Sequence, residues 1–118
     1  MPNDGRIGKL AGAIGLCRKA GRLIIGTESV CEAVAGKKKP YAVFLANNNA
    51  PNTDQRVRNK CSYYGVEIFS LPLDGETLAN AVGKQSHTAA VAVTDENLFR
   101  LVSGLTGRQS VPDGADGE

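Results

Sequence analysis

Two short runs of uninterrupted apolar residues constrain the fold of this chain more than any other feature. The first is Tyr-Ala-Val-Phe-Leu-Ala at residues 41–46, and the second is Ala-Ala-Val-Ala-Val at residues 89–93. A run without polar alternation indicates a strand that is covered on both faces. Segments with the helical spacing of apolar residues surround these runs. The pattern predicts a three-layer α/β/α sandwich with a central four-stranded, mostly parallel (mixed) sheet.

The remaining elements follow from the same two periodicities. Further strands are predicted over residues 23–25 and 66–71. A first helix carries one buried stripe, which comprises Ile7, Leu10, Ala11, Ile14 and Cys17. The other helices are predicted over residues 27–35, from residue 52 or 53 to residue 64, after Asp74, and after Thr94.

Residues with known end preferences mark where the helices start and stop. Asp74 and Thr94 are expected to cap the fourth and fifth helices, because a short oxygen-bearing side chain accepts a hydrogen bond from a free N–H there. Glycines are placed to end the others, with Gly36 closing the second helix in a left-handed turn and Gly65 and Gly83 ending the third and fourth. The expected buried stripe of the fifth helix comprises Leu98, Leu101, Val102 and Leu105.

The charges separate a mildly basic body from an acidic tail. The chain carries 14 lysines and arginines against 12 aspartates and glutamates. One arginine and three acids lie beyond residue 106, which leaves 13 basic and 9 acidic residues in the body. This surplus is a modest signal for a polyanionic partner. We expect one domain over residues 7–105, with a flexible N-terminus at 1–6 and a disordered acidic tail at 106–118.

Residues suited to catalysis or metal binding form no recognisable pattern. GxSxG, HExxH, P-loop and GxGxxG motifs are absent, and the one histidine, His87, has no evident partner to orient it as a base. Cys17, Cys31 and Cys61 form no CxxC pair, so we expect buried structural thiols in a reducing cytoplasm. No signal peptide or membrane-spanning run is found. The sequence predicts a soluble, cytoplasmic protein without catalytic residues, metal or cofactor.

A strand-to-helix junction is the most informative local feature for function. An apolar strand stops at Gly26, and a helix opens at Thr27. The first N–H groups of a helix have no partner within it, which suits a phosphate group or an RNA backbone. Glu28 and Glu32 complicate this interpretation, because they place two carboxylates one helical turn apart at the mouth of the site. The alternative is an ordinary turn with Thr27 as the helix cap.

One group of cations and one polar loop are further candidates for binding. Arg18, Lys19 and Arg22 lie at the end of the first helix and the entry to the first strand. RNA contact competes there with a favourable interaction between cations and the helix C-terminus. The loop at residues 83–88 carries hydrogen-bond donors of every kind and precedes a buried strand, a common position for binding loops.

Other cations lie farther from the junction. The lysines at residues 37–39 are either a solvated connector or a peripheral phosphate contact, since they follow the far end of the second helix. Arg56 and Lys60 are one turn apart on the third helix, on a face that we expect to be solvated.

Six short segments follow one another in a characteristic order. They are LCRKAGRL at 16–23, GTE at 26–28, YAVFLA at 41–46, CSYYGV at 61–66, LANAVGK at 78–84 and AVAVTD at 90–95. The series resembles the kink-turn RNA-binding ribosomal proteins of the L-seven-A-e and L-thirty-e superfamily, and is most similar to their small bacterial YlxQ-like branch of "probable ribosomal proteins". The resemblance covers about residues 7–105. No single segment is diagnostic, whereas the full series is specific.

The resemblance implies where RNA would bind. In that family the strand-to-helix junction and the loop before the last strand lie side by side and hold a sharply bent RNA. The family pattern Gly-x-Asn-Glu-x-x-Lys falls here on Gly26, Glu28, Ser29 and Glu32, so that only the glycine is kept and an acid replaces the lysine. With residues 84–89 as the second loop, the expected RNA-binding residues are Arg18, Lys19, Arg22, Gly26, Thr27, Glu28, Ser29, Glu32, Lys84, Gln85, His87 and Thr88.

The sequence thus predicts a non-enzymatic, monomeric RNA-binding protein of the bacterial cytoplasm. Its partner would be structured, kink-turn-like RNA, including ribosomal RNA or the ribosome, with a role in translation. The alternative is a protein-interaction module that kept the fold and lost kink-turn binding, because an acidic face at Glu28 and Glu32 suits a basic protein. A small-molecule enzyme is the least supported interpretation, for want of any catalytic set.

Overall fold

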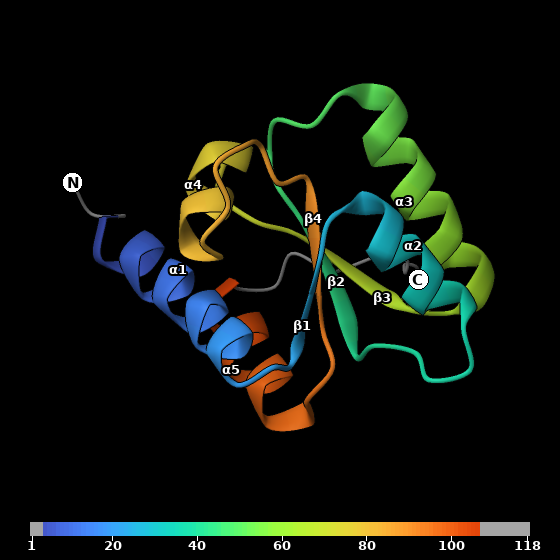
Figure 1. Ribbon diagram of the computed structural model, residues 1–118, viewed down its shortest axis with the longest axis horizontal. Helices are drawn as coiled ribbons and strands as arrows, with labels where there is room; N and C mark the ends of the chain where they lie inside the picture. The colour runs from blue at the N-terminus through green and yellow to red at the C-terminus, as the bar shows by residue number, and fades with distance from the viewer. Residues whose placement is uncertain (1–3, 107–118) are drawn as a thin grey trace, which may run out of the picture.

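The computed structural model describes residues 4–106, in which helices and strands alternate (Figure 1). The predicted elements are all present, in the predicted order. α1 begins at Asp4, so residues 4–6 are helical where the sequence predicts a flexible N-terminus. Thr106, predicted to begin the disordered tail, is instead the buried last residue of the fifth helix, and the rest of the expected tail lies outside the described residues. The elements are α1 (Asp4–Lys19), β1 (Leu23–Ile25), α2 (Thr27–Ala35), β2 (Ala42–Leu45), α3 (Pro51–Tyr64), β3 (Glu67–Ser70), α4 (Gly75–Ala81), β4 (Ala90–Val93) and α5 (Glu96–Thr106).

The strands form one mixed sheet in the order β1-β4-β2-β3. β2 and β3 are parallel, whereas β4 runs antiparallel to both β1 and β2, with Leu45 opposite Ala90. The sheet is therefore mixed as predicted, but the prediction of mostly parallel pairing is wrong. Uninterrupted apolar runs indicate that both faces of a strand are covered. They carry no information on strand direction, which depends on how the chain returns to the sheet.

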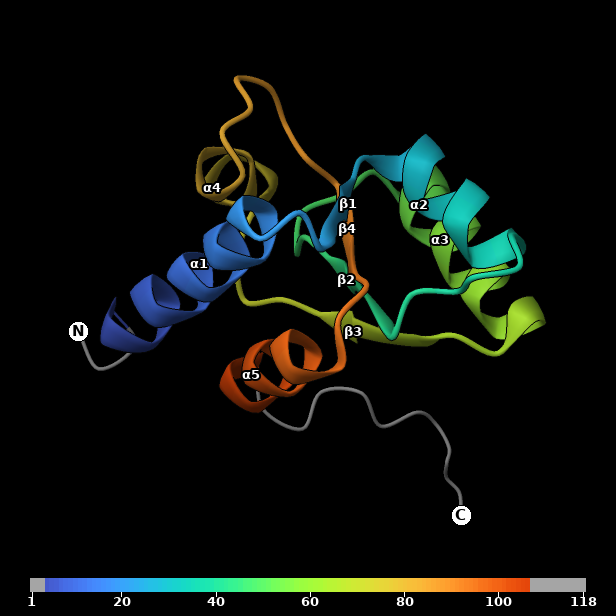
Figure 2. The same ribbon diagram turned by 60° about the horizontal axis from the view of Figure 1, so that its bottom comes forward.

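Helices cover both faces of this sheet, which confirms the predicted sandwich. α1, α4 and α5 lie on one face, and α2 and α3 lie on the other (Figure 1 and Figure 2). Each face of the sheet has its own hydrophobic core, the first beneath α1, α4 and α5 and the second beneath α2 and α3. Successive residues of β2 pack alternately into these two cores. Phe44 stacks on Phe69 in the first core, with 5.1 Å between ring centroids, while Val43 and Leu45 pack in the second. β2 and β4 are fully buried, which explains why their sequences lack polar alternation.

Two of the predicted helix ends have the expected geometry. Asp74 caps α4, because its carboxylate accepts a hydrogen bond from the Thr77 N–H at 2.8 Å. Gly65 ends α3 with φ of 74°, a left-handed conformation that glycine adopts at little cost.

Two other predicted ends are wrong. The cap of α5 is Asp95 and not Thr94, because the Asp95 carboxylate accepts a hydrogen bond from the Leu98 N–H at 3.0 Å. Gly36 ends α2 in an extended conformation with φ of −82°, so the left-handed turn predicted there is absent. A glycine marks the end of a helix, but the direction of the following chain decides which conformation it takes.

The buried face of α5 also differs from the predicted stripe. Val102 is fully buried, but Leu101 is 42% exposed. Phe99 turns toward the sheet, where its ring lies 6.1 Å from the Phe69 ring and 6.3 Å from the Tyr41 ring, measured between centroids. The buried face of α5 therefore includes Phe99, and Leu101, which the sequence places in the buried stripe, lies at the surface.

All three cysteines are buried and free, as the sequence predicts. Cys17 lies in the core beneath α1, and Cys31 and Cys61 lie between α2, α3 and the sheet. Within residues 4–106, no helix has the combined length and apolarity needed to cross a bilayer.

The native protein should therefore resist thiol alkylation. Burial raises the pKa of Cys61 from 9.0 to about 11. At pH 8 only about one Cys61 thiol in a thousand is then ionised, against about one in ten without burial, and the thiolate is the reactive form. We expect iodoacetamide at pH 8 to label Cys61 far more slowly in buffer than in urea, as followed by peptide mass spectrometry. Equal rates in the two solutions would contradict its buried position.

Candidate nucleic-acid interface

Gly26 sets the geometry of the junction between β1 and α2. Its φ and ψ are 101° and 148°, a region that is essentially restricted to glycine. In this conformation its N–H donates to the Ala90 carbonyl, and its own carbonyl accepts from the Val30 N–H, both at 2.9 Å. Gly26 thus occupies the cap position, with no side-chain cap, and Thr27 is the first helical residue. The alternative of a Thr27 cap is wrong.

The first turn of α2 consequently presents free hydrogen-bond donors. The Gly26 carbonyl receives the N–H of Val30, so the preceding N–H groups, those of residues 27–29, have no acceptor within the helix. The positive end of the helix dipole lies at the same place. Together these features favour an anionic group at the start of α2.

The loop before β4 lies directly beside this junction. A cleft of about 290 Å³ separates them, lined by residues 25–27 on one side and by Lys84 and residues 86–89 on the other. The loop wall is fixed by a hydrogen bond from the Thr88 N–H to the Gly75 carbonyl at 3.1 Å. The juxtaposition that the family resemblance implies is therefore present, and it brings Gly26, Thr27, Lys84, His87 and Thr88 to one cleft.

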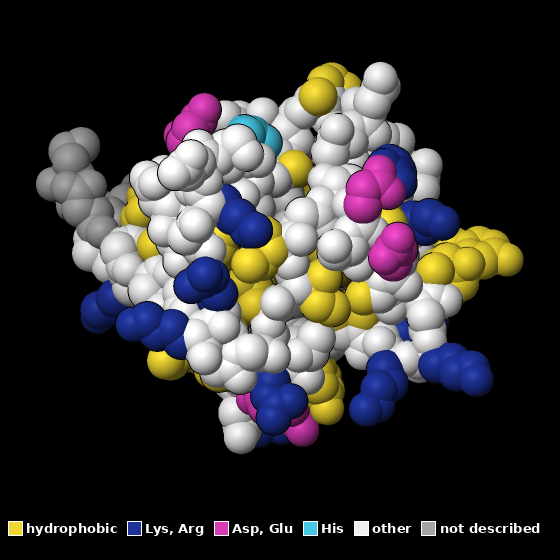
Figure 3. Space-filling view, viewed as in Figure 1, with side chains coloured by type: hydrophobic (Ala, Val, Ile, Leu, Met, Phe, Trp, Pro, Cys, Tyr) yellow, Lys and Arg dark blue, Asp and Glu magenta, His cyan; other side chains and the backbone are white. Residues whose placement is uncertain are grey.

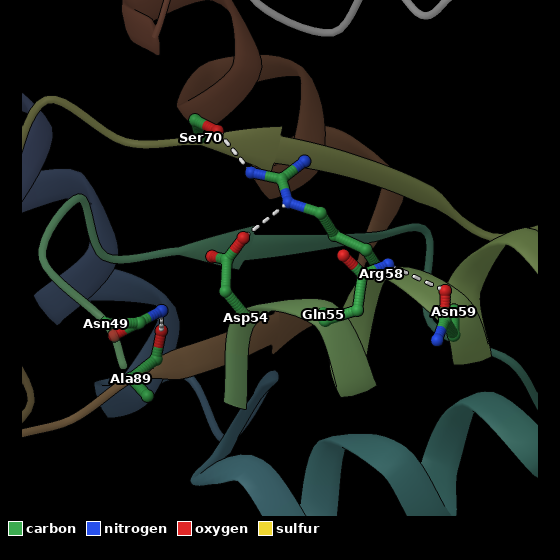
Figure 4. A network of polar contacts seen from close by, with 7 residues as sticks. All are labelled: Asn49, Asp54, Gln55, Arg58, Asn59, Ser70 and Ala89. Carbon is green, nitrogen blue, oxygen red and sulfur yellow. Dashed lines mark hydrogen bonds and ion pairs between the residues drawn. The ribbon is translucent and has the colours of Figure 1, made fainter. Parts of the chain in front are cut away.

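An asparagine-rich loop after β2 supports the second wall. Asn49 donates from its side-chain amide to the Ala89 carbonyl at 3.0 Å (Figure 4). Its amide oxygen lies 3.1 Å from Nε2 of His87, which orients the imidazole ring. Asn48 accepts a hydrogen bond from the Gly75 N–H at 2.8 Å. Neither asparagine was among the predicted site residues, because these contacts join residues 27, 38 and 40 positions apart.

Helix α3, which packs against α2, is held in place by its own network of polar contacts. Arg58 donates to the Asp54 carboxylate at 2.7 Å and to the Ser70 hydroxyl at 2.9 Å, while Gln55 donates to Asn59 at 2.9 Å (Figure 4). The arginine thereby ties α3 to β3 and fixes the helix that faces α2.

Glu28 is held by an arginine from this neighbouring helix. Arg56 donates two hydrogen bonds to the Glu28 carboxylate, at 2.8 and 2.9 Å. These hydrogen bonds and the guanidinium charge hold the pKa of Glu28 below its usual value. Arg56 is exposed, as the sequence predicts, and its pairing with Glu28 brings it to the edge of the site. Glu32 is exposed on α2, and no ion pair to it occurs among the described residues.

The predicted cations are spread over the edge of the site. The Arg18 guanidinium lies against the start of the loop, since a Cβ added to Gly83 would lie 3.4 Å from its central carbon. Lys84 lines the cleft itself. Lys19 borders a separate groove between α1 and α4, and Arg22 is exposed at the entry to β1. Figure 3 shows cationic side chains along α1, and acidic side chains over α2.

The remaining predicted residues differ in their access to a ligand. Ser29 and Gln85 are exposed, on α2 and on the loop respectively. Thr88 is only 5% exposed, and its hydroxyl lies 3.5 Å from the Ser86 carbonyl. It therefore supports the loop from beneath. Within residues 4–106 no group of three or more histidine, cysteine or acidic side chains is arranged to hold a metal ion.

Fold and site together define a class of protein. It is a small α/β/α sandwich that presents free helix N–H groups and a polar loop across one cleft, an arrangement suited to an anionic ligand. The chain belongs to the ribosomal protein L7Ae/L30e/S12e/Gadd45 family, whose model matches residues 8–102. This confirms the family predicted from the six sequence segments.

Two curated relatives belong to the predicted bacterial branch. The RNA-binding protein YlxQ of Enterococcus faecium is 37% identical over 82 residues, which cover 70% of this chain and 78% of the relative. The RNA-binding protein YlxQ of Bacillus subtilis is 26% identical over 92 residues, which cover 78% of this chain and 89% of the relative.

Solved structures share the fold at low sequence identity. A protein of unknown function from Bacillus halodurans superposes with a TM-score of 0.75 at 24% identity, covering 85% of this chain and 98% of its own. A 15.5 kD RNA-binding protein from Giardia lamblia superposes with a TM-score of 0.72 at 16% identity, covering 91% and 89%. These similarities establish the five-helix sandwich independently of the family model.

Proposed function

We propose that this chain is a non-enzymatic RNA-binding protein of the bacterial cytoplasm. The observation that carries the proposal is the cleft between the start of α2, at Thr27, and the loop at Lys84 and residues 86–89, beside the free N–H groups of the first helical turn. Two curated relatives are RNA-binding proteins by name, which agrees with this chemistry. Sharply bent structured RNA, including ribosomal RNA, suits the site best, because two walls from distant parts of the chain can grip both sides of a bend.

Each part of the cleft has a distinct role in this proposal. The N–H groups of residues 27–29 would donate to one phosphate at the positive end of the helix dipole. Lys84 and Arg18 would neutralise neighbouring phosphates as the backbone leaves the cleft. His87, fixed by Asn49, and exposed Gln85 offer hydrogen bonds to base edges or ribose hydroxyls.

The acidic residues at the junction do not prevent RNA binding in this scheme. The Glu28 carboxylate already forms an ion pair with Arg56, so the negative charge of Glu28 is largely compensated. Glu32 remains, and an exposed carboxylate can accept hydrogen bonds from the amino and imino groups of an unpaired base.

The Glu28–Arg56 pairing weakens the alternative of a protein-interaction module, because only one of the two glutamates is left for a basic partner. Nuclease treatment before a pull-down separates the two: a stoichiometric protein partner that survives it would favour the alternative.

Removing the cation of the cleft should weaken binding in a salt-dependent manner. Lys84→Ala is expected to bind a bent RNA about tenfold more weakly, equivalent to about 1.4 kcal/mol, through loss of one phosphate contact. The slope of log affinity against log salt should fall by about 0.7–0.9. Fluorescence anisotropy between 50 and 200 mM salt measures both quantities.

A matched control distinguishes a local contact from net charge. Lys9→Ala removes the same charge from an exposed position on α1, more than two turns from Arg18. We expect it to leave affinity and slope nearly unchanged. Binding that does not depend on salt, or that both substitutions weaken equally, would rule out the assignment of Lys84.

A further inference from the structure

A second surface lies outside the cleft, along the outer side of α3. An open groove of about 790 Å³ runs beside this helix from Asn52 to Tyr64. Tyr63 is 81% exposed, more than any other large hydrophobic residue of the described chain. Figure 3 shows apolar side chains that project beyond α3, with lysine and arginine side chains on both sides of them. A tyrosine side chain exposed to this extent offers ring surface to a flat partner.

Aromatic rings of the groove lie in contact with each other and with lysines in and beside it. The Tyr63 ring meets the Tyr64 ring edge to face, at 4.8 Å and 83°. The Lys39 ammonium lies 4.8 Å from the centre of the Tyr64 ring, and the Lys60 ammonium lies 5.9 Å from it. Hydrogen bonds of 2.9 Å from Lys39 to two carbonyls at the end of α2 hold it in place. The Lys39 side chain therefore has little conformational entropy left to lose when a ligand binds.

The charged residues that line this groove are cationic. Lys60 and Arg56 line the groove together with amide and aromatic side chains, and no carboxylate lines it in the part of the chain that the structure describes. Exposed Lys37 and Lys38 adjoin Lys39 at the end of α2. Arg56 links the groove to the junction, because it is paired with Glu28 in the first turn of α2. A polyanion that leaves the cleft therefore meets this surface next.

We infer that Lys39, Lys60, Tyr63 and Tyr64, here called the tyrosine platform, bind single-stranded RNA that continues from the RNA in the cleft. Exposed aromatic rings beside cations hold unpaired nucleotides, since each base offers a face for stacking and each phosphate a negative charge. Tyr63 lies about 10 Å from Arg56 along the helix axis, a span of about three stacked nucleotides. The inference extends the proposed function, and it identifies the added ligand as an unpaired flank.

The first experiment needs only an oligonucleotide. Oligouridine of ten nucleotides is titrated at low salt against the full chain, with binding followed by fluorescence anisotropy. We expect Tyr63→Ala to bind it about tenfold more weakly, because one stacked base is lost, and Tyr63→Phe to bind it as the native protein does. Tyr41→Ala is the control, since Tyr41 is a second tyrosine with an exposed side chain, at 49%, but lies beside Phe99 of α5. The exposed Tyr63 side chain can be truncated without opening the core.

The second experiment joins the flank to a bent RNA. The native protein should bind this RNA more tightly with a ten-nucleotide oligouridine extension than without it, and Tyr63→Ala should lose the gain while keeping the affinity for the blunt form. No gain from the extension together with no binding of free oligouridine would overturn the inference. Equal binding of oligouridine and polyglutamate would also overturn it, in favour of an acidic protein partner. Failure to bind the blunt RNA, with Tyr63-dependent binding of oligouridine, would reject the proposed function and leave the platform assigned.

Discussion

Gly26→Ala is expected to lower the free energy of unfolding by about 2 kcal/mol, within the range for residues forced into sparsely populated backbone conformations. A Cβ at this position would meet nothing within 4 Å, so the cost arises from the backbone angle of 101° and not from a clash. Alanine would pull the junction toward an ordinary φ, and the paired hydrogen bonds to Ala90 and Val30 would weaken. Urea denaturation followed by circular dichroism measures the change.

Gly12→Ala is a control for which we expect the opposite change in the free energy of unfolding. Gly12 lies within α1, and a Cβ there also meets nothing within 4 Å. The same chemical change should therefore stabilise the protein by about 0.5–1 kcal/mol, because alanine is the better helix former. We further expect Gly26→Ala to lose affinity for bent RNA, while Gly12→Ala keeps it. Equal stabilities for the two variants would show that the junction does not need its glycine.

Glu32→Lys is expected to increase affinity for a kink-turn RNA by about 30-fold, or about 2 kcal/mol. The substitution removes one exposed carboxylate near the phosphates and adds one cation, a change of two charges. It also gives this position the residue type that the family pattern carries. The fold should not be disturbed, since Glu32 is exposed and no ion pair to it occurs among the described residues.

The gain must be specific to bent RNA to support the account. Titration against a kink-turn RNA and a straight duplex of equal length makes that comparison. Glu67→Lys, on the exposed end of edge strand β3, produces the same change in net charge away from the cleft. We expect Glu67→Lys to alter affinity for both RNAs slightly and equally. A gain with Glu32→Lys that is just as large for the duplex would indicate general electrostatics.

Local sequence patterns predicted the layers of the fold but not the pairing of its strands. The apolar run at residues 41–46 required two covered faces, and Phe44 and Val43 indeed point into separate cores. The position of β4 between β1 and β2 is a long-range property, set by where the chain crosses the sheet. The same distinction applies to Gly36, whose conformation depends on the path that follows it.

The parts of the site that are short continuous segments of the sequence were predictable. The junction and the loop follow from the family resemblance, and the cleft between them is present. Arg56 is exposed as predicted, but its pairing with Glu28 was not predictable, because the two residues lie 28 positions apart. Asn49 was missed for a similar reason, since its contacts with His87 and Ala89 span 38 and 40 residues. No periodicity or local motif encodes such pairs.

The most direct test of the proposed binding site is a heteronuclear NMR titration of the full chain with a kink-turn RNA. The amide resonances of residues 27–29 and of residues 84–89 should shift first and together, since free N–H groups of α2 and the facing loop form the two walls of one cleft. The amides of α5, which lies away from the cleft, should remain unchanged. Shifts confined to other surfaces, with the amides of residues 27–29 unmoved at saturation, would contradict the account.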